Sequence, residues 1–151
     1  MVGIQLRKRW AGQPLWARWI LAVYLTGFLE GACAHLLDLI RGGIHAYASF
    51  PQVSIQAFFI SLAVLDPLIV VLVTLVRRQG IWLASGVMVL DVSANWISNW
   101  QWLHDHPSRL LHPVGLLPIT LFGLFVVTSL VPLHHTTATT HRNPQAVLPS
   151  P

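Results

Sequence analysis

The chain has 151 residues, of which 54% are hydrophobic and 9% are charged. A soluble domain carries roughly 25% charged residues, so this chain cannot cover a water-facing surface in the usual way. Nine Lys and Arg against five Asp and Glu give a net charge of +4, which is too few cations for a nucleic-acid footprint. The composition therefore excludes a soluble enzyme, a disordered protein and a nucleic-acid-binding domain. It predicts a single-domain integral membrane protein.

The first apolar stretch follows a basic N-terminus, as a signal peptide would. Ala32-Cys33-Ala34 resembles a signal-peptidase site, but the apolar stretch continues well past it. Glu30 stands where a lipoprotein signal needs an aliphatic residue. We therefore expect an uncleaved first membrane helix. Cys33 is the only cysteine, so an intramolecular disulfide is excluded.

Four stretches are long and apolar enough to cross a bilayer, which takes about 20 residues. They cover residues 15–40, 53–76, 81–103 and 113–133. Their short connections imply antiparallel neighbours. We therefore predict an all-α fold, an antiparallel bundle of four transmembrane helices in a domain of residues 1–133. Residues 134–151 are polar and contain proline, and we expect them to form a disordered cytoplasmic tail.

The cations are distributed unevenly over the predicted connections. Seven of the nine fall on one side of the predicted topology: Arg7, Lys8, Arg9, Arg18, Arg77, Arg78 and Arg142. Cytoplasmic loops carry the excess of Lys and Arg in membrane proteins. Both termini are therefore expected in the cytoplasm, in a multi-pass protein of the cell membrane, most simply a bacterial inner membrane.

Polar residues at membrane depth recur along the first three spans. The first span carries Glu30, His35 and Asp38, and the second carries Asp66 before Pro67. The third holds a stripe at four-residue spacing: Asp91, Asn95 and Asn99, with Trp96 and Trp100 beside it. A charge at mid-bilayer costs at least about 2.5–3.5 kcal/mol, so these residues need a reason to be there.

One explanation is a polar and aromatic pocket that opens outward. Glu30 and Asp91 are then the candidate catalytic acids. The candidate ligand-binding residues are His35, Asp38, Asp66, Asn95, Trp96, Asn99 and Trp100. Tryptophan rings suit an ammonium group or a carbocation. The alternative is a buried polar network that only fixes helix packing, with the tryptophans as interfacial anchors.

Histidines cluster in the connection before the fourth span, at His104, His106 and His112. Together with Asp105 they could hold a divalent metal, but side chains of this kind more often decorate an interfacial loop. We predict no metal site. No cofactor is predicted either, because haem between helices needs histidines on two facing spans and only His35 lies within one.

Several segments resemble the EXPERA group of four-span membrane proteins, which includes the sterol Δ8–Δ7 isomerase and the sigma-2 receptor. They are Trp19 to Tyr24 followed by Asp38-Leu39, and Phe58-Phe59-Ile60 leading to Pro67, the short basic turn and Trp82. The resemblance extends over about residues 15–130. It implies a pocket open to the membrane, lined by acids and aromatics, for amphipathic amines or sterols.

We therefore expect a protein that binds a small lipophilic or amphipathic molecule. An extended form of this hypothesis is that the protein also isomerises the bound molecule. Its expected partners are the lipid bilayer and this ligand. A second copy of the chain or a membrane complex is a further possible partner, and no nucleic-acid partner is expected. Two other functions stay open at this point. One is a non-enzymatic accessory subunit of a membrane complex, and the other is a small dimeric transporter.

Overall fold

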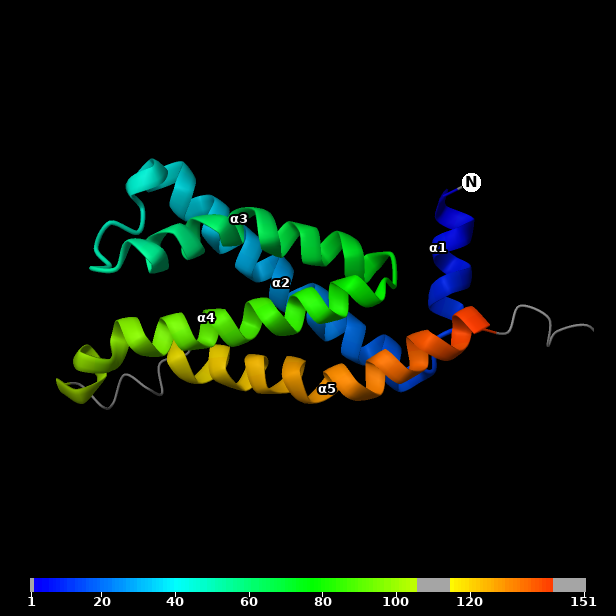
Figure 1. The fold of residues 1–151 in the computed structure, drawn as a ribbon. Coiled ribbons are helices and arrows are strands. Elements are labelled where there is room, and N and C mark those ends of the chain that lie inside the picture. Colours follow the sequence, from blue (N-terminus) through cyan, green and yellow to red (C-terminus); the bar gives the residue numbers. More distant parts are fainter. Residues whose placement is uncertain (1, 106–114, 143–151) are drawn as a thin grey trace, which may run out of the picture.

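The structure, a computed structural model, describes residues 2–105 and 115–142, and in those ranges its regular structure is entirely helical (Figure 1). Four helices are long and apolar enough to cross a membrane. They are α2 (Leu15–Gly42), α3 (Val53–Thr74), α4 (Arg78–Asp105) and α5 (Leu116–Arg142). The prediction of an all-α chain with four membrane-length helices is confirmed.

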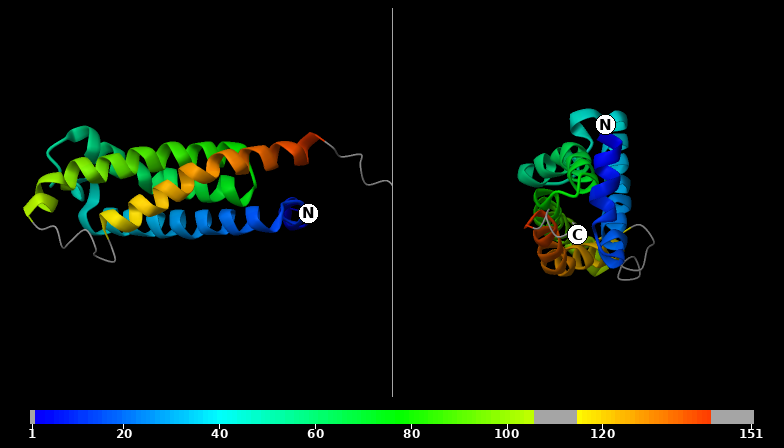
Figure 2. Two further views of the ribbon diagram at one scale, coloured as in Figure 1. Left: turned by 90° about the horizontal axis from the view of Figure 1, so that it is seen from below. Right: turned by 90° about the vertical axis from the view of Figure 1, so that its right-hand side faces the viewer.

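The long helices pack on one another in chain order, α2 on α3, α3 on α4 and α4 on α5. They run along the length of one bundle, with α2 inclined to the other three (Figures 1 and 2). The C-terminal ends of α2 and α4 and the start of α3 lie at one end of the bundle, which we call the loop end (Figure 1). The other end holds the start of α2 and the α3–α4 turn. We call it the basic end, because it carries Arg9, Arg18, Arg77 and Arg78.

A helix that the sequence analysis did not predict, α1 (Val2–Ala11), crosses the basic end roughly perpendicular to the bundle (Figures 1 and 2). Two side chains attach it to the end of α3. The indole Nε1 of Trp10 donates to the carbonyl oxygen of Thr74 at 2.9 Å, and Nη1 of Arg9 donates to that of Leu75 at 3.0 Å. These bonds satisfy carbonyls that a helix end leaves without an intrahelical partner.

The α3–α4 turn closes with two backbone bonds. Val76 N–H donates to the Val73 carbonyl at 2.8 Å, and Arg77 N–H donates to the Leu72 carbonyl at 3.0 Å. This is the Schellman pattern, which needs a left-handed residue after the helix. Val76 takes that position with φ 51°. Glycine is the usual residue there, since a side chain is disfavoured at such a φ.

Tyr24 is the largest fully buried side chain among the described residues and ties α2 to α5. Its hydroxyl donates to the Val126 carbonyl at 2.8 Å and lies 2.9 Å from Oγ of Ser129. One turn further along α2 the two helices touch at Gly27, where an added Cβ would clash with the Phe122 ring. This contact closes the bundle on the side of the basic end.

The chain differs from the expected boundaries at its C-terminal side. Helix α5 continues past Leu133 to Arg142, into the segment expected to be a disordered tail. Pro132 lies inside the helix without stopping it. Residues 143–151 lie outside the described residues.

Candidate functional site

A cavity of about 730 Å³ opens between the four long helices in the half of the bundle nearer the loop end. Every long helix contributes to its wall. The polar side chains that line it are Glu30, His35, Asp66, Asp91, Asn95 and Asn99. The apolar lining includes Phe28, Met88, Ile119 and Phe122. The structure thus brings together six of the nine residues predicted as site residues.

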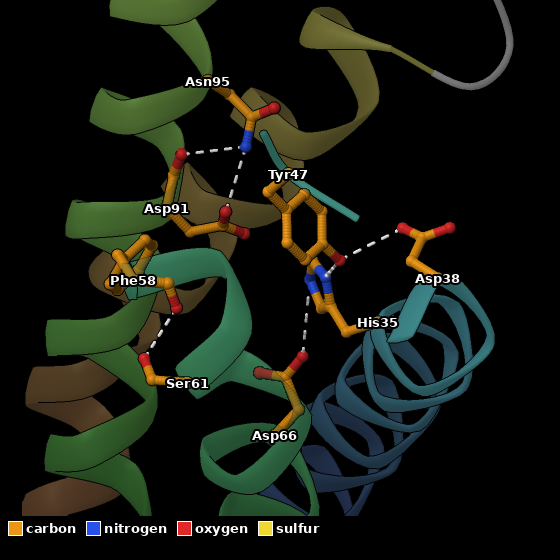
Figure 3. Close-up of polar contacts among 8 residues, drawn as sticks. All are labelled: His35, Asp38, Tyr47, Phe58, Ser61, Asp66, Asp91 and Asn95. Carbon is orange, nitrogen blue, oxygen red and sulfur yellow. Dashed lines mark hydrogen bonds and ion pairs between the residues drawn. The ribbon is translucent and has the colours of Figure 1, made fainter. Parts of the chain in front are cut away.

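Asp66 on α3 is buried in the wall of this cavity. Its Oδ2 lies 4.0 Å from Nε2 of His35 on α2. Gly31 provides the space for the carboxyl group, because a Cβ at this glycine would lie 2.7 Å from Asp66 Oδ2. The close approach of α2 and α3 at Gly31 is therefore what puts the acid and the histidine side by side (Figure 3).

Asp91 on α4 is buried on the opposite wall and has a partner on its own helix. Nδ2 of Asn95 donates to the Oδ1 and to the backbone oxygen of Asp91, both at 3.0 Å (Figure 3). Nδ2 of Asn99 donates in turn to the backbone oxygen of Asn95 at 2.9 Å. The four-residue spacing that predicted a stripe on one helix face therefore produces a ladder of amides that leads from Asp91 toward the loop end.

Glu30 lies at the edge of the cavity and is exposed, unlike the two aspartates. It also borders a shallower groove on the outside of α2 and α3, together with Cys33, Val70 and Thr74. The two predicted catalytic acids therefore differ in their surroundings. Glu30 is exposed at the edge of the cavity, whereas Asp91 is buried in its wall. Asp66 is the acid that shares with Asp91 a buried position in the cavity lining.

Three residues predicted as ligand-binding are not in the cavity lining. Trp96 is turned toward α5, where its Nε1 donates to Thr120 Oγ1 at 2.8 Å. Trp100 is 59% exposed, as an interfacial anchor would be. Asp38 is exposed near the loop end and reaches the cavity only through another residue, Tyr47.

Tyr47, in the connection between α2 and α3, was missed by the sequence analysis. Its side chain is buried, its hydroxyl oxygen lies 2.8 Å from Nδ1 of His35, and its O–H donates to Oδ2 of Asp38 at 3.1 Å (Figure 3). Burial and the hydrogen bond to Asp38 both raise the pKa of Tyr47 above its usual range. The only signal in the sequence is a single tyrosine in the connection between the first two spans, which is too weak to assign a role.

The lining has a pronounced charge imbalance. Three carboxyl groups, those of Glu30, Asp66 and Asp91, face or border the cavity, while the described lining residues include no Lys or Arg. His35 is the only basic side chain among them. Such a site favours a ligand group that brings positive charge or several hydrogen-bond donors.

Metal binding receives no support from the described part of the chain, which contains no group of three or more His, Cys, Asp or Glu arranged around one point. His106 and His112, from the histidine cluster of the sequence analysis, lie outside the described residues. The cavity acids are also spread over three helices, with Asp91 already engaged by Asn95.

No family, curated protein or solved structure matches the chain. The resemblance to the EXPERA group stays a prediction.

Proposed function

We propose that this protein spans the membrane four times and binds a small amphipathic molecule with a cationic head in the cavity. In this proposal the long helices form an antiparallel bundle with both termini in the cytoplasm. The cations gathered at the basic end support that orientation. The cavity lies in the other half of the bundle, so it would be reached from the outer leaflet or the outer surface.

The observation that carries the proposal is the excess of carboxyl groups in the cavity. Asp66 and Asp91 are buried on two different helices and face the same space. Burying a carboxylate inside a membrane with no Lys or Arg beside it costs free energy. A bound ammonium group would offset that cost for both aspartates.

The apolar part of the cavity fits the other half of such a ligand. Phe28, Met88 and Phe122 lie on the side of the basic end, where α2 and α5 meet. A volume of about 730 Å³ lies inside the range of roughly 300–1,000 Å³ that holds small ligands. A hydrocarbon tail directed toward this floor would place its head beside the aspartates.

The competing explanation is a polar network that only holds helices together. The hydrogen bonds from Asn95 to Asp91 favour it, since they satisfy one carboxyl without a ligand. The two explanations differ in what an amide substitution does. A packing acid replaced by its amide is neutral or stabilising, because no buried charge must then be carried, whereas a ligand-binding acid loses affinity.

Native mass spectrometry of the full chain, with three probes of equal chain length, tests the proposal. The probes are dodecylamine, dodecanol and dodecanoate. We expect dodecylamine to bind best and dodecanoate least. Asp66→Asn and Asp91→Asn should each weaken dodecylamine binding at least about tenfold, which corresponds to roughly 1.4 kcal/mol.

Asp38→Asn is the matched control, because Asp38 is an acid of the same helix bundle that does not line the cavity. Its affinity for dodecylamine should equal that of the unaltered chain. Circular dichroism and thermal unfolding establish that each variant is folded. Equal binding of all three probes, or folded aspartate variants that keep full affinity, would leave only the packing network.

A further inference from the structure

A continuous row of titratable side chains connects the cavity with the loop end. It begins at Asp66 in the cavity wall and passes to His35, whose Nε2 lies 4.0 Å from Asp66 Oδ2. It continues from Nδ1 of His35 to the Tyr47 hydroxyl at 2.8 Å, and from there to Asp38 Oδ2 at 3.1 Å (Figure 3).

Exposure to solvent changes along this row. The side chain of Asp66 is 6% exposed and that of His35 is 16% exposed. Tyr47 is 8% exposed, whereas Asp38 at the end of the row is an exposed residue. The two central groups are therefore shielded, and the row ends in a carboxyl group that can exchange protons with its surroundings.

Aromatic rings hold the central groups in position. Phe59 lies 5.4 Å from the Tyr47 ring and 6.2 Å from the His35 ring, measured between centroids. Phe50 stacks against Phe59 at 5.1 Å and lies 6.3 Å from Tyr47. This apolar packing restricts the motion of the imidazole and the phenol.

The titratable groups around His35 come from every element packed near it. Asp38 and Glu30 lie on its own helix, Tyr47 lies in the following connection, Asp66 lies on α3, and Asp91 lies across the cavity on α4 (Figure 3). Of these, only Tyr47 and Asp66 approach the two ring nitrogens within 4.0 Å. An imidazole contacted on both nitrogens can accept a proton at one and release a proton from the other.

We propose that His35, Tyr47 and Asp38 form a proton pathway between Asp66 and the loop end. In the outward direction Asp66 gives its proton to Nε2 of His35, and Nδ1 releases its own proton to the Tyr47 oxygen. Tyr47 passes its hydroxyl proton to the Asp38 carboxylate. Asp66 ends ionised and Asp38 ends protonated, while His35 and Tyr47 keep the same number of protons.

The hydrogen bond from Tyr47 to Asp38 is already oriented for this step. The gap of 4.0 Å between His35 and Asp66 is about 1 Å longer than a hydrogen bond, so this transfer requires the two side chains to approach each other by that amount. After the step the neutral His35 carries its proton on Nε2 instead of Nδ1. A ring rotation or the reverse transfer restores the starting arrangement. The pathway concerns proton access and holds whether or not a ligand fills the cavity.

Time-resolved infrared spectroscopy of the full chain, after release of protons from a photolabile compound, measures the pathway directly. The carboxyl band of Asp66 is assigned by its disappearance in Asp66→Asn. In Tyr47→Phe the protonation of Asp66 should slow at least about tenfold, because positioned proton-transfer groups contribute roughly 10²- to 10⁴-fold. The final amplitude of the band should be unchanged.

Asp38→Asn supplies a second test that does not depend on the fold of the aromatic cluster, since Asp38 is exposed. It should slow the same band. Tyr24→Phe is the matched control, because Tyr24 is a buried tyrosine hydrogen-bonded to Val126 and Ser129 and lies outside the row. Wild-type rates in both Tyr47→Phe and Asp38→Asn, or an Asp66 band that never responds to pH, would overturn the pathway. Either result would leave the dodecylamine measurement unaffected.

Discussion

At the scale of single residues, two glycines on α2 determine the shape of the site. Gly31 leaves room for the Asp66 carboxyl group, and Gly27 lets the Phe122 ring lie flush against the helix. A side chain at either position would have to displace its neighbour. The glycines therefore set both the floor of the cavity and the position of its acid on α3.

Gly27→Ala should lower the free energy of unfolding by about 1–3 kcal/mol, the usual cost of overpacking a well-filled site. The added Cβ would clash with the Phe122 ring. Reversible unfolding in mixed detergent micelles measures the loss. Gly86→Ala is the matched control, since a Cβ at Gly86 meets nothing within 4 Å. It should be neutral or more stable by about 0.5–1 kcal/mol.

The combination of Gly27→Ala with Phe122→Leu extends this test. The smaller side chain at position 122 removes the clash, so the two changes should compensate in part and give a coupling energy in a double-mutant cycle. If Gly27→Ala and Gly86→Ala behaved alike, the contact between α2 and α5 would not be as close as described.

The sequence identifies the ionisable site residues that lie within apolar stretches of membrane-spanning length, because burying a charge there is costly. Asp66, Asp91 and His35 could be singled out in this way, and the structure brings them around one space. Spacing alone could not tell which face of α4 turns inward, so Trp96 was expected in the pocket although it bonds to Thr120 on α5. Tyr47 lies outside any span, where a hydroxyl costs little and gives no signal.

At the scale of helices and connections, the four long helices follow from hydropathy and length. Helix α1 does not, because it is short and its pattern is partly basic. Its position depends on tertiary contacts, above all the bond from Trp10 to the end of α3. The continuation of α5 to Arg142 likewise depends on helix propagation through polar residues. From their composition alone, these residues are predicted to form a tail.

The orientation of the helices in the membrane can be tested at the connection between α2 and α3 and at the turn between α3 and α4. In a chain with Cys33→Ser, which removes the single native thiol, Ser49→Cys and Gln79→Cys place exposed thiols at the loop end and the basic end. A membrane-impermeant maleimide added to intact cells should label position 49 and not position 79. The reason is that the positive charge beside Gln79, on Arg77 and Arg78, favours the cytoplasm. Labelling of position 79 alone would reverse the orientation.

At the scale of the whole molecule, the cavity and the basic end occupy opposite halves of one bundle. The bundle is closed between them by Tyr24, which is bonded to α5, and by the contact of Gly27 with Phe122. The polar wall of the cavity is formed by residues on α2, α3 and α4, and α5 completes its apolar floor. A sequence can predict such polar residues one span at a time, but their convergence depends on how the helices are rotated.

Photoaffinity labelling tests most directly the claim that this cavity holds an amphipathic cation. The probe is dodecylamine with a diazirine at the far end of its chain, added to the full protein in liposomes. We predict crosslinks to Phe28, Met88 and Phe122 that excess dodecylamine suppresses and that Asp66→Asn and Asp91→Asn reduce. Crosslinks confined to exposed residues such as Leu90 and Val131, unaffected by competition, would contradict the account.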